Sequence, residues 1–264
     1  MITGSNGTAT NTPQTISREQ FLQQLFTYFK NAIHNSQPAR EYLQKRNLDF
    51  KQIEVGYNAG QFHHGARKEE TLINQALQYG LLIDKNMIAR TGEKAYNVFG
   101  KWCVVFALRN YKDAITGLYF RSTLNDAAQR HFYLKERKGL YPNHPTAATK
   151  KIILTESIID AATLLQQKEI AESYAILGLY GTNGLTDEHI KAITALKQLE
   201  EIIFWLNADD AGKQAVNKYA AMFTELLPNI KITNVELPDN EDINSIAQGH
   251  EANILNYYIN ERKL

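Results

Sequence analysis

Cysteine is almost absent from this chain: its 264 residues contain only Cys103. A single cysteine excludes an internal disulfide and any zinc cluster built on cysteine thiolates, so no zinc is expected in this chain and a reducing cytoplasm is its expected location. No apolar run approaches the ~18 residues of a membrane-spanning helix, so no membrane contact is expected. Residues 1–16 lack the apolar segment of a signal peptide and are predicted to form a flexible leader.

The chain also lacks an overall excess of positive or negative charge. Lysine and arginine number 29, aspartate and glutamate 28, and the net charge is +1. Locally, basic residues outnumber acidic ones between Lys94 and Lys151, whereas acids cluster in the later part of the chain. This separation is expected of an enzyme that grips a polyanion and holds cations over it. An ordinary mixed, solvated surface explains the same counts equally well.

Residues 17–148 are predicted to form an α+β subdomain. Ser17 followed by Gln20 is a helix-start pattern, and apolar residues at helical spacing continue from it. Two later apolar runs separated by a polar turn predict a β-hairpin. Helical signals run over 17–46, with a second helix expected near 38–45, and a further helix is expected over 69–79. The expected strands are 98–110 and 115–122.

Residues 149–264 change in character, because short apolar strands alternate with helical patterns. This alternation predicts βαβ units and a parallel sheet. The expected strands are 152–154, 175–179, 202–206 and 231–235, and the expected helices are 157–167, 186–199, 210–227 and 243–248. We therefore predict an α/β protein: an α+β N-terminal subdomain followed by a domain with a central parallel sheet flanked by helices.

Acidic residues follow two of these strands directly. Glu156 comes after 152–154, and Asp209 comes after 202–206. Ligand sites in open α/β sheets lie at the carboxyl ends of strands, and Mg²⁺ binds through one or two carboxylates plus substrate phosphates. The pattern predicts a metal-dependent nucleotidyl-transfer site. Each acid also fits a helix N-cap, and Asp242 fits a solvated turn almost as well as a ligand.

Several short segments carry a family resemblance through their order and spacing. They are YLQKRNL at 42–48, GLYFR at 117–121, KGLY at 138–141, TESIID at 155–160, GTNGLT at 181–186, NADDAGKQA at 207–215 and EDIN at 241–244. Together they resemble the motifs of the bacterial DnaG-type primase catalytic core and its TOPRIM domain. The resemblance runs from around Ser17 to the C-terminus and implies the TOPRIM fold for the second domain.

The resemblance implies roles for ten residues. Glu156 would be an acid/base residue or would shape the metal site, with Asp160 one helical turn away. Four oxygen-bearing side chains would bind metal: Asp209, Asp242, Asn207 and Asn244. Four basic side chains would line the path of template or nucleotide phosphates: Arg46, Lys101, Arg121 and Lys138.

The implied reaction is DNA-templated synthesis of short RNA primers on single-stranded DNA, with ribonucleoside triphosphates as substrates and Mg²⁺ or Mn²⁺ as cofactor. A replicative helicase and a zinc-binding module acting in trans are the further partners that it allows. Asn207 and Asn244 depart from the family pattern, which has acids there, and each amide removes one negative charge. Two alternatives stay open: a weakened primase-like module that binds single-stranded DNA or a replication partner, and a TOPRIM nuclease.

Two further features have both a functional and a structural explanation. Trp102 and Tyr119 fit base-stacking residues, although half-buried strand aromatics more often belong to the core. His63 and His64 are adjacent on a predicted loop without a third ligand in reach, and we expect them to be surface histidines.

Overall fold

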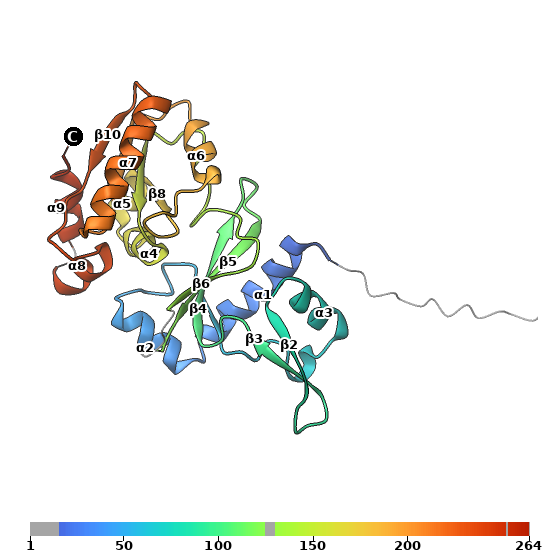
Figure 1. The fold of residues 1–264 in the computed structure, drawn as a ribbon. Coiled ribbons are helices and arrows are strands. Elements are labelled where there is room, and N and C mark those ends of the chain that lie inside the picture. The colour runs from blue at the N-terminus through green and yellow to red at the C-terminus, as the bar shows by residue number, and fades with distance from the viewer. Residues whose placement is uncertain (1–15, 125–129, 252, 264) are drawn as a thin grey trace, which may run out of the picture.

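The computed structural model describes residues 16–124, 130–251 and 253–263, so the expected leader lies outside the described residues except for Ile16. The chain forms two lobes, each built on its own sheet (Figure 1). This arrangement confirms the predicted α/β class. Among the helices of these ranges, none combines the length and the apolar character that crossing a bilayer requires.

The N-terminal lobe is a four-stranded antiparallel sheet with the order β1-β4-β5-β6. Its elements are α1 (Arg18–Ile33), α2 (Gln37–Lys45), β1 (Gly56–Asn58), η1 (Gly65–Arg67), α3 (Glu70–Gln78), β2 (Leu82–Ile88), β3 (Lys94–Val98), β4 (Cys103–Arg109), β5 (Ile115–Ser122) and β6 (His131–Tyr133). Helix α1 begins at the predicted capping box of Ser17 and Gln20, and it buries Phe26 and Phe29 in the core beneath the sheet. The β4–β5 pairing confirms the predicted hairpin.

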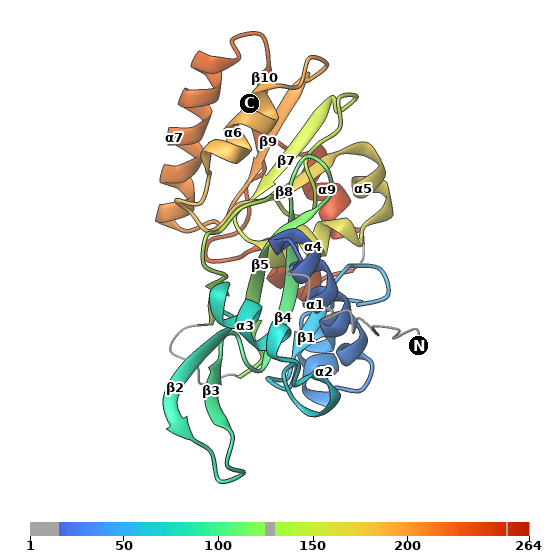
Figure 2. The same cartoon turned by 90° about the vertical axis from the view of Figure 1, so that its right-hand side faces the viewer.

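A separate two-stranded hairpin, β2–β3, projects from this lobe and corrects the prediction of one strand over 98–110 (Figure 2). That range contains the end of β3, a turn and β4. Gly100 and Trp102 interrupt the strand, because both have a left-handed backbone, with φ of 61° and 58°. A Cβ at Gly100 would lie 2.3 Å from the ring of Phe120, so only glycine fits there.

The C-terminal lobe is a parallel sheet with the order β10-β9-β7-β8. Its elements are β7 (Lys151–Thr155), α4 (Ile158–Leu165), α5 (Lys168–Ser173), β8 (Ala175–Gly178), α6 (Asp187–Thr194), β9 (Glu201–Trp205), α7 (Asp210–Leu226), β10 (Lys231–Asn234), α8 (Ile243–Gly249) and α9 (Ile254–Asn260). Helices α6 and α7 pack on one face, and α4, α8 and α9 pack on the other. All four predicted strands are present.

Alternation along the buried strands explains this two-sided packing. In β7, Ile152 and Leu154 enter the core under α6 and α7, whereas Ile153 enters the core under α4. The last residues of β7 and β9, Thr155 and Trp205, are paired across the sheet. The segments that follow these two strands therefore emerge side by side at one sheet edge.

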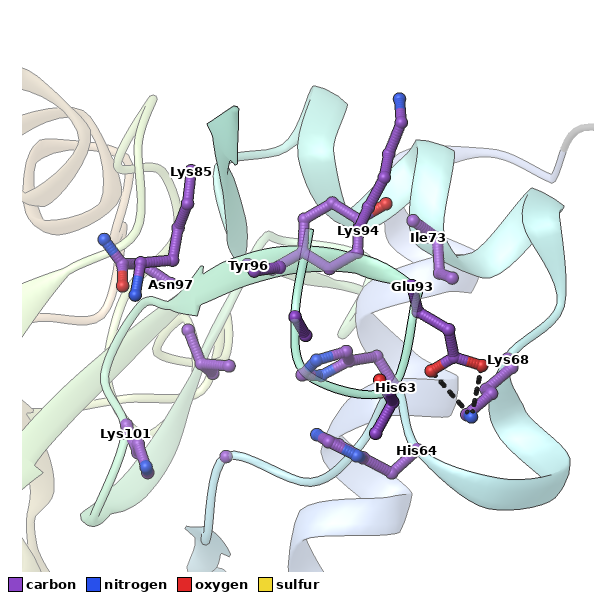
Figure 3. Close-up of a pocket in the computed structure, with 15 residues that line it drawn as sticks. His63, His64, Lys68, Ile73, Lys85, Glu93, Lys94, Tyr96, Asn97 and Lys101 are labelled. Atoms are coloured by element: carbon purple, nitrogen blue, oxygen red, sulfur yellow. Dashed lines mark hydrogen bonds and ion pairs between the residues drawn. The ribbon is translucent and has the colours of Figure 1, made fainter. Parts of the chain in front are cut away.

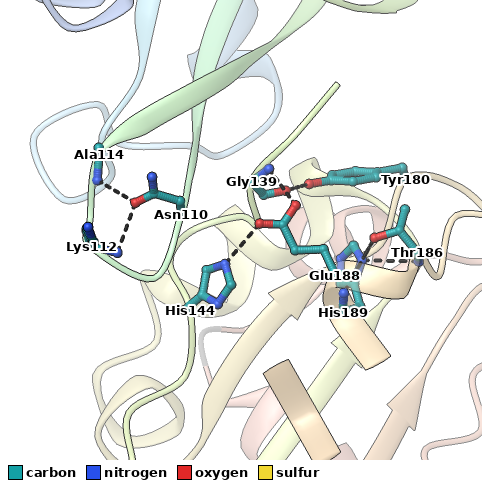
Figure 4. A network of polar contacts seen from close by, with 9 residues as sticks. All are labelled: Asn110, Lys112, Ala114, Gly139, His144, Tyr180, Thr186, Glu188 and His189. Atoms are coloured by element: carbon teal, nitrogen blue, oxygen red, sulfur yellow. Dashed lines mark hydrogen bonds and ion pairs between the residues drawn. The ribbon is translucent and has the colours of Figure 1, made fainter. Parts of the chain in front are cut away.

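The two lobes are in direct contact. One hydrophobic core includes residues of α2 and β4 together with residues of β7 and α4. Polar contacts add to it, because Glu188 at the start of α6 accepts from the Gly139 N–H (2.8 Å) and contacts His144 Nε2 (3.2 Å; Figure 4). The Tyr180 hydroxyl also donates to the Gly139 carbonyl. The segment that connects the lobes is thus held against α6, and the boundary between 148 and 149 stays a prediction.

Candidate active site

Glu156 lies at the centre of the candidate site, directly after β7. The Thr182 hydroxyl donates to its Oε1 (2.9 Å), and Asn207 donates through Nδ2 to Oε1 (3.3 Å) and through its backbone N–H to Oε2 (3.4 Å). Burial is the main cause that raises the pKa of Glu156, and the charges of Asp209 and Asp242 raise it further. The hydrogen bonds from Thr182 and Asn207 lower it in part. Glu156 is therefore a buried carboxylate within the field of two other acids.

Asn207 stands where the resemblance expects an acid. It follows β9, whose end lies beside the end of β7, and both of its N–H donors reach Glu156. An aspartate here would place a second negative charge against Glu156. The amide instead donates a hydrogen bond, which favours the ionised form of Glu156 while removing one charge from the site.

Asp209 is the N-cap of α7, and its Oδ1 accepts from the Gly212 N–H at 2.7 Å. The first turn of this helix packs tightly on the preceding loop, because a Cβ at Gly212 would lie 2.1 Å from the Asn207 carbonyl oxygen. Asp209 therefore caps a helix, as the sequence pattern allowed. Capping uses one carboxylate oxygen and leaves the second, on an exposed side chain, for another ligand.

Asp242 is the N-cap of α8 and belongs to a capping box. Its Oδ1 accepts from the Ser245 N–H (2.6 Å), and its own N–H donates to Ser245 Oγ (2.9 Å). The side chain is half-buried at the start of the helix, which differs from the solvated turn that was the alternative. As in Asp209, one oxygen serves the helix.

Asp160 lies in the first turn of α4 and is only 2% exposed. The Ser157 hydroxyl donates to it at 2.6 Å, and the Asn244 backbone N–H donates at 3.3 Å. Burial first, and then the charge of Asp242, raises the pKa of Asp160. Asp160 is therefore a buried carboxyl group between α4 and α8.

Asn244 is fully buried, and its side-chain amide is fully engaged. Its Oδ1 accepts from Arg46 Nη1 (3.1 Å) and Gln248 Nε2 (2.8 Å). Its Nδ2 donates to the Arg46 carbonyl (2.8 Å) and to Thr163 Oγ1 (2.9 Å). This geometry assigns Asn244 to the support of Arg46. The metal role that the resemblance implies stays a prediction that the geometry does not favour.

The structure separates the four predicted phosphate-binding residues into two groups. Arg46 and Arg121 both lie beside Tyr42: the Arg46 guanidinium is 5.9 Å from the ring centroid, and Arg121 Nε donates to the hydroxyl at 3.3 Å. Through Asn244, Arg46 reaches the acidic side of the site. Lys101 instead lies next to Trp102, and Lys138 is exposed in the segment between the lobes.

The acids fit a divalent cation in chemical kind. Glu156, Asp209 and Asp242 are oxygen donors whose mutual repulsion a cation would relieve. Within the described ranges, no three histidine, cysteine, aspartate or glutamate side chains are grouped closely enough to hold a metal ion alone. Since Mg²⁺ commonly uses one or two carboxylates plus substrate phosphates, these residues would hold it together with a substrate.

Thr182 and Tyr219 belong to the site although no role is predicted for them. The Tyr219 hydroxyl donates to the Thr182 carbonyl at 2.8 Å, and this contact fixes the loop that reaches Glu156. The loop is tight, because a Cβ at Gly184 would lie 2.3 Å from the Tyr180 backbone. The glycines of GTNG were the available signal, since they indicate a close backbone approach.

Comparisons with known proteins agree with the fold of the chain. The Toprim-like family matches residues 153–247. The chain superposes on a DNA primase domain from Pseudomonas aeruginosa with a TM-score of 0.70 and 22% identity, covering 92% of this chain and 78% of that one. The DnaG primase catalytic domain bound to single-stranded DNA gives a TM-score of 0.67 and 18% identity, covering 92% and 80%.

Among curated proteins, the DNA helicase/primase of Enterobacteria phage T3 is 28% identical over 117 residues. This alignment covers 44% of this chain and 20% of the phage protein, so the chain matches about a fifth of that relative's length.

The C-terminal lobe thus carries a Toprim-like domain, whose matched segment contains all six acidic and amide residues of the candidate site. The described chain as a whole has the fold of DnaG-type primase catalytic cores. The fold expectation drawn from the sequence is confirmed.

Proposed function

We propose that the chain is a primase-type nucleotidyltransferase that makes short RNA primers on single-stranded DNA with Mg²⁺ or Mn²⁺. The observation that carries this proposal is Glu156 at the carboxyl edge of the parallel sheet, with Asp209 and Asp242 close enough to raise its pKa. Acids at this edge, on a primase-core fold, suit the binding of cations and phosphates. A replicative helicase and a zinc-binding module acting in trans are partners that we include in the proposal.

Each residue then has a task that its contacts support. Asp209 and Asp242 would hold the cation through the oxygens that capping leaves, and Glu156 would add charge or accept a proton. When bound, the cation would supply charge neutralisation at the reacting phosphates. Arg46 and Arg121, both positioned by Tyr42, would bind phosphates of the nucleotide or template.

Nucleotide incorporation on single-stranded DNA with Mn²⁺ tests this proposal. Wild-type chain, Glu156→Gln and Asn207→Asp would be compared under the same conditions. Synthesis by the wild type and its loss in Glu156→Gln are expected, since glutamine keeps the size of the side chain and one acceptor oxygen but removes the charge. Equal rates in wild type and Glu156→Gln would refute the assignment of the site.

A second candidate is a primase-like module that binds DNA or a partner without catalysis. The Asn207 amide favours this candidate. It stands where the resemblance expects an acid, so the site has one negative charge less with which to hold a cation. Metal titration separates the two functions: Mn²⁺ binding at submillimolar concentration supports the enzyme. Absence of binding below several millimolar, together with no incorporation, supports the binding module.

A further inference from the structure

A basic hollow lies between the β2–β3 hairpin and the loop before α3 (Figure 3). Its volume of about 680 Å³ is in the range of ligand-binding pockets. The hairpin is on the end of the N-terminal lobe that faces away from the C-terminal lobe in both views (Figures 1 and 2). The hollow is therefore distinct from the acidic sheet edge around Glu156.

Lysines give this hollow its charge. Four of them line it, and Glu93 is the single acid among its described lining residues. Glu93 pairs with Lys68 at 2.7 Å, and Lys94 lies 3.9 Å from Asp84. In the described part of the chain, Lys85 and Lys101 have no carboxylate at ion-pair distance. Two lysines without an acidic partner among the described residues therefore line one hollow, which favours an anionic ligand.

Trp102 stands beside Lys101 at the edge of the hollow. Its side chain is 45% exposed, and the Lys101 ammonium lies 4.1 Å from the centroid of its ring. Its φ of 58° is unusual for a bulky residue. Hydrogen bonds hold this conformation: the Trp102 N–H donates to Asn58 O (2.7 Å), and the Trp102 carbonyl accepts from the N–H and hydroxyl of Thr123 (3.0 and 2.8 Å).

A strained backbone that is held by three hydrogen bonds and presents an indole to solvent is a signal of function. The contrast with Tyr119, the other aromatic considered for stacking, is clear. Tyr119 is only 2% exposed and packs in the core, so the structural explanation holds for it. Trp102 has a partly exposed indole and an adjacent cation, which are features of a base-stacking residue.

We propose that Trp102, Lys101 and Lys85 form a site for single-stranded nucleic acid, in which a base stacks on the indole and the lysines pair with phosphates. The indole is not part of the hollow's lining, so a ligand that contacts it and Lys85 must extend beyond one nucleotide. The identity of this ligand as template rests on the proposed function. The site would hold the strand at a distance from the acidic edge and so increase its residence on the enzyme.

Intrinsic fluorescence tests the stacking step, because the chain has two tryptophans of opposite exposure. Trp205 is fully buried in the C-terminal lobe, whereas Trp102 is exposed. Titration of the full chain with single-stranded oligothymidylate should quench the emission. Trp102→Phe should abolish the quenching and retain the emission of Trp205, while oligonucleotide affinity stays close to the wild-type value because phenylalanine also stacks.

Affinity and salt dependence test the contacts separately, by anisotropy of a fluorescein-labelled oligothymidylate. Trp102→Leu should raise the Kd roughly fivefold or more, as expected for loss of one stacked base. Lys85→Gln combined with Lys101→Gln should reduce the slope of log K against log salt by about 1.4, or about 0.7 for each phosphate contact. Lys112→Gln is the matched control: Lys112 stands over exposed Tyr111 at the other end of β4, and its slope should not change.

An unchanged Kd in Trp102→Leu, or a slope that falls equally in the Lys112→Gln control, would overturn the site. If thymidine monophosphate quenches as strongly as the oligonucleotide does, the ligand is a mononucleotide, and the proposal of a site for a single strand is overturned. Quenching in a chain that incorporates no nucleotide would support this site and contradict the proposed enzyme. Incorporation without any quenching would do the reverse.

Discussion

Asn207→Asp is the most informative single change, because it restores the family acid at the cost of a hydrogen bond. In the native chain Asn207 Nδ2 donates to Glu156 Oε1 at 3.3 Å. The variant would set two carboxylates at this separation. We expect it to destabilise the protein without metal and to gain more stability from Mn²⁺ than the wild type does.

The variant can either bear the repulsion between two carboxylates or hold a proton, and the smaller of these two costs sets the loss of stability. Two unit charges 3.3 Å apart repel by about 5 kcal/mol at an effective dielectric constant of about 20. The pair avoids this repulsion if one carboxyl group stays protonated. For a carboxyl group with the ordinary pKa of 4.5, protonation at pH 7 costs about 3.4 kcal/mol (2.5 × 1.36). Protonation is cheaper, so the expected loss is about 3 kcal/mol.

The sign of the pH dependence follows from the same cause. A carboxyl group whose pKa is raised in the folded state binds more protons there than in the unfolded chain, so stability falls as pH rises. At pH 5 holding the proton costs only about 0.7 kcal/mol (0.5 × 1.36). The stability deficit of Asn207→Asp should therefore be small at pH 5 and large at pH 7.

Thermal unfolding in chelator and in Mn²⁺ measures the effect. A loss of about 3 kcal/mol corresponds to a decrease in Tm of roughly 6–12 °C for a chain of this size, and Mn²⁺ should recover most of it. Asn217→Asp, the same change on the exposed side of α7, should shift Tm by less than about 2 °C. A deficit that is absent in chelator, equal at pH 5 and 7, or unaffected by Mn²⁺ would refute the reasoning.

Three further changes have expected outcomes. Gly212→Ala should displace Asn207, whose carbonyl lies 2.1 Å from the added Cβ, and lower Tm by several degrees together with any incorporation activity. Glu201 is 5% exposed and pairs with Arg262 at 2.7 and 2.9 Å. Arg262→Met leaves this buried carboxylate without its partner, so it should lower the free energy of unfolding in urea by about 3–5 kcal/mol. The double variant Glu201→Gln, Arg262→Met should recover part of that loss. Burial lowers the pKa of His189 from 6.5 to about 4. Its neutral form therefore contributes about 3 kcal/mol (2.5 × 1.36) to stability above pH 6.5, and this contribution is lost as pH falls toward 4. His189→Gln should make the free energy of urea unfolding less dependent on pH over that range.

The sequence predicted the C-terminal lobe better than the N-terminal one, and the reason is periodicity. Strands β7 and β9 are continuous apolar runs because both of their faces are buried, and such runs are easy to recognise. Strand β2 has an irregular pattern of exposure, and its register shifts near Asn86, whose φ is 53°. No alternation marks that strand, so the β2–β3 hairpin was not predicted.

For the site, strand ends were predictable and long-range partners were not. The rule that ligands gather at the carboxyl ends of parallel strands placed Glu156 beside the segment after β9, and Glu156 does contact Asn207 there. The contact of Asn244 with Arg46 joins residues 198 positions apart. It depends on how the C-terminal end of α2 meets α8 across the two lobes, which no local pattern of residues encodes.

The two amides that depart from the family pattern are built into hydrogen bonds that an acid could not make. Aspartate has no N–H, yet Asn207 Nδ2 donates to Glu156 and Asn244 Nδ2 donates to the Arg46 carbonyl and Thr163. Each replacement is therefore supported by its neighbours and is not an isolated loss of charge. Since Asn244 is neutral, and no carboxylate pairs with Arg46 in the described ranges, the guanidinium keeps its full charge for an external phosphate. The site thus holds less negative charge for the cation and more positive charge for the nucleic acid, so substrate phosphates must supply a larger share of the ligands that hold the metal.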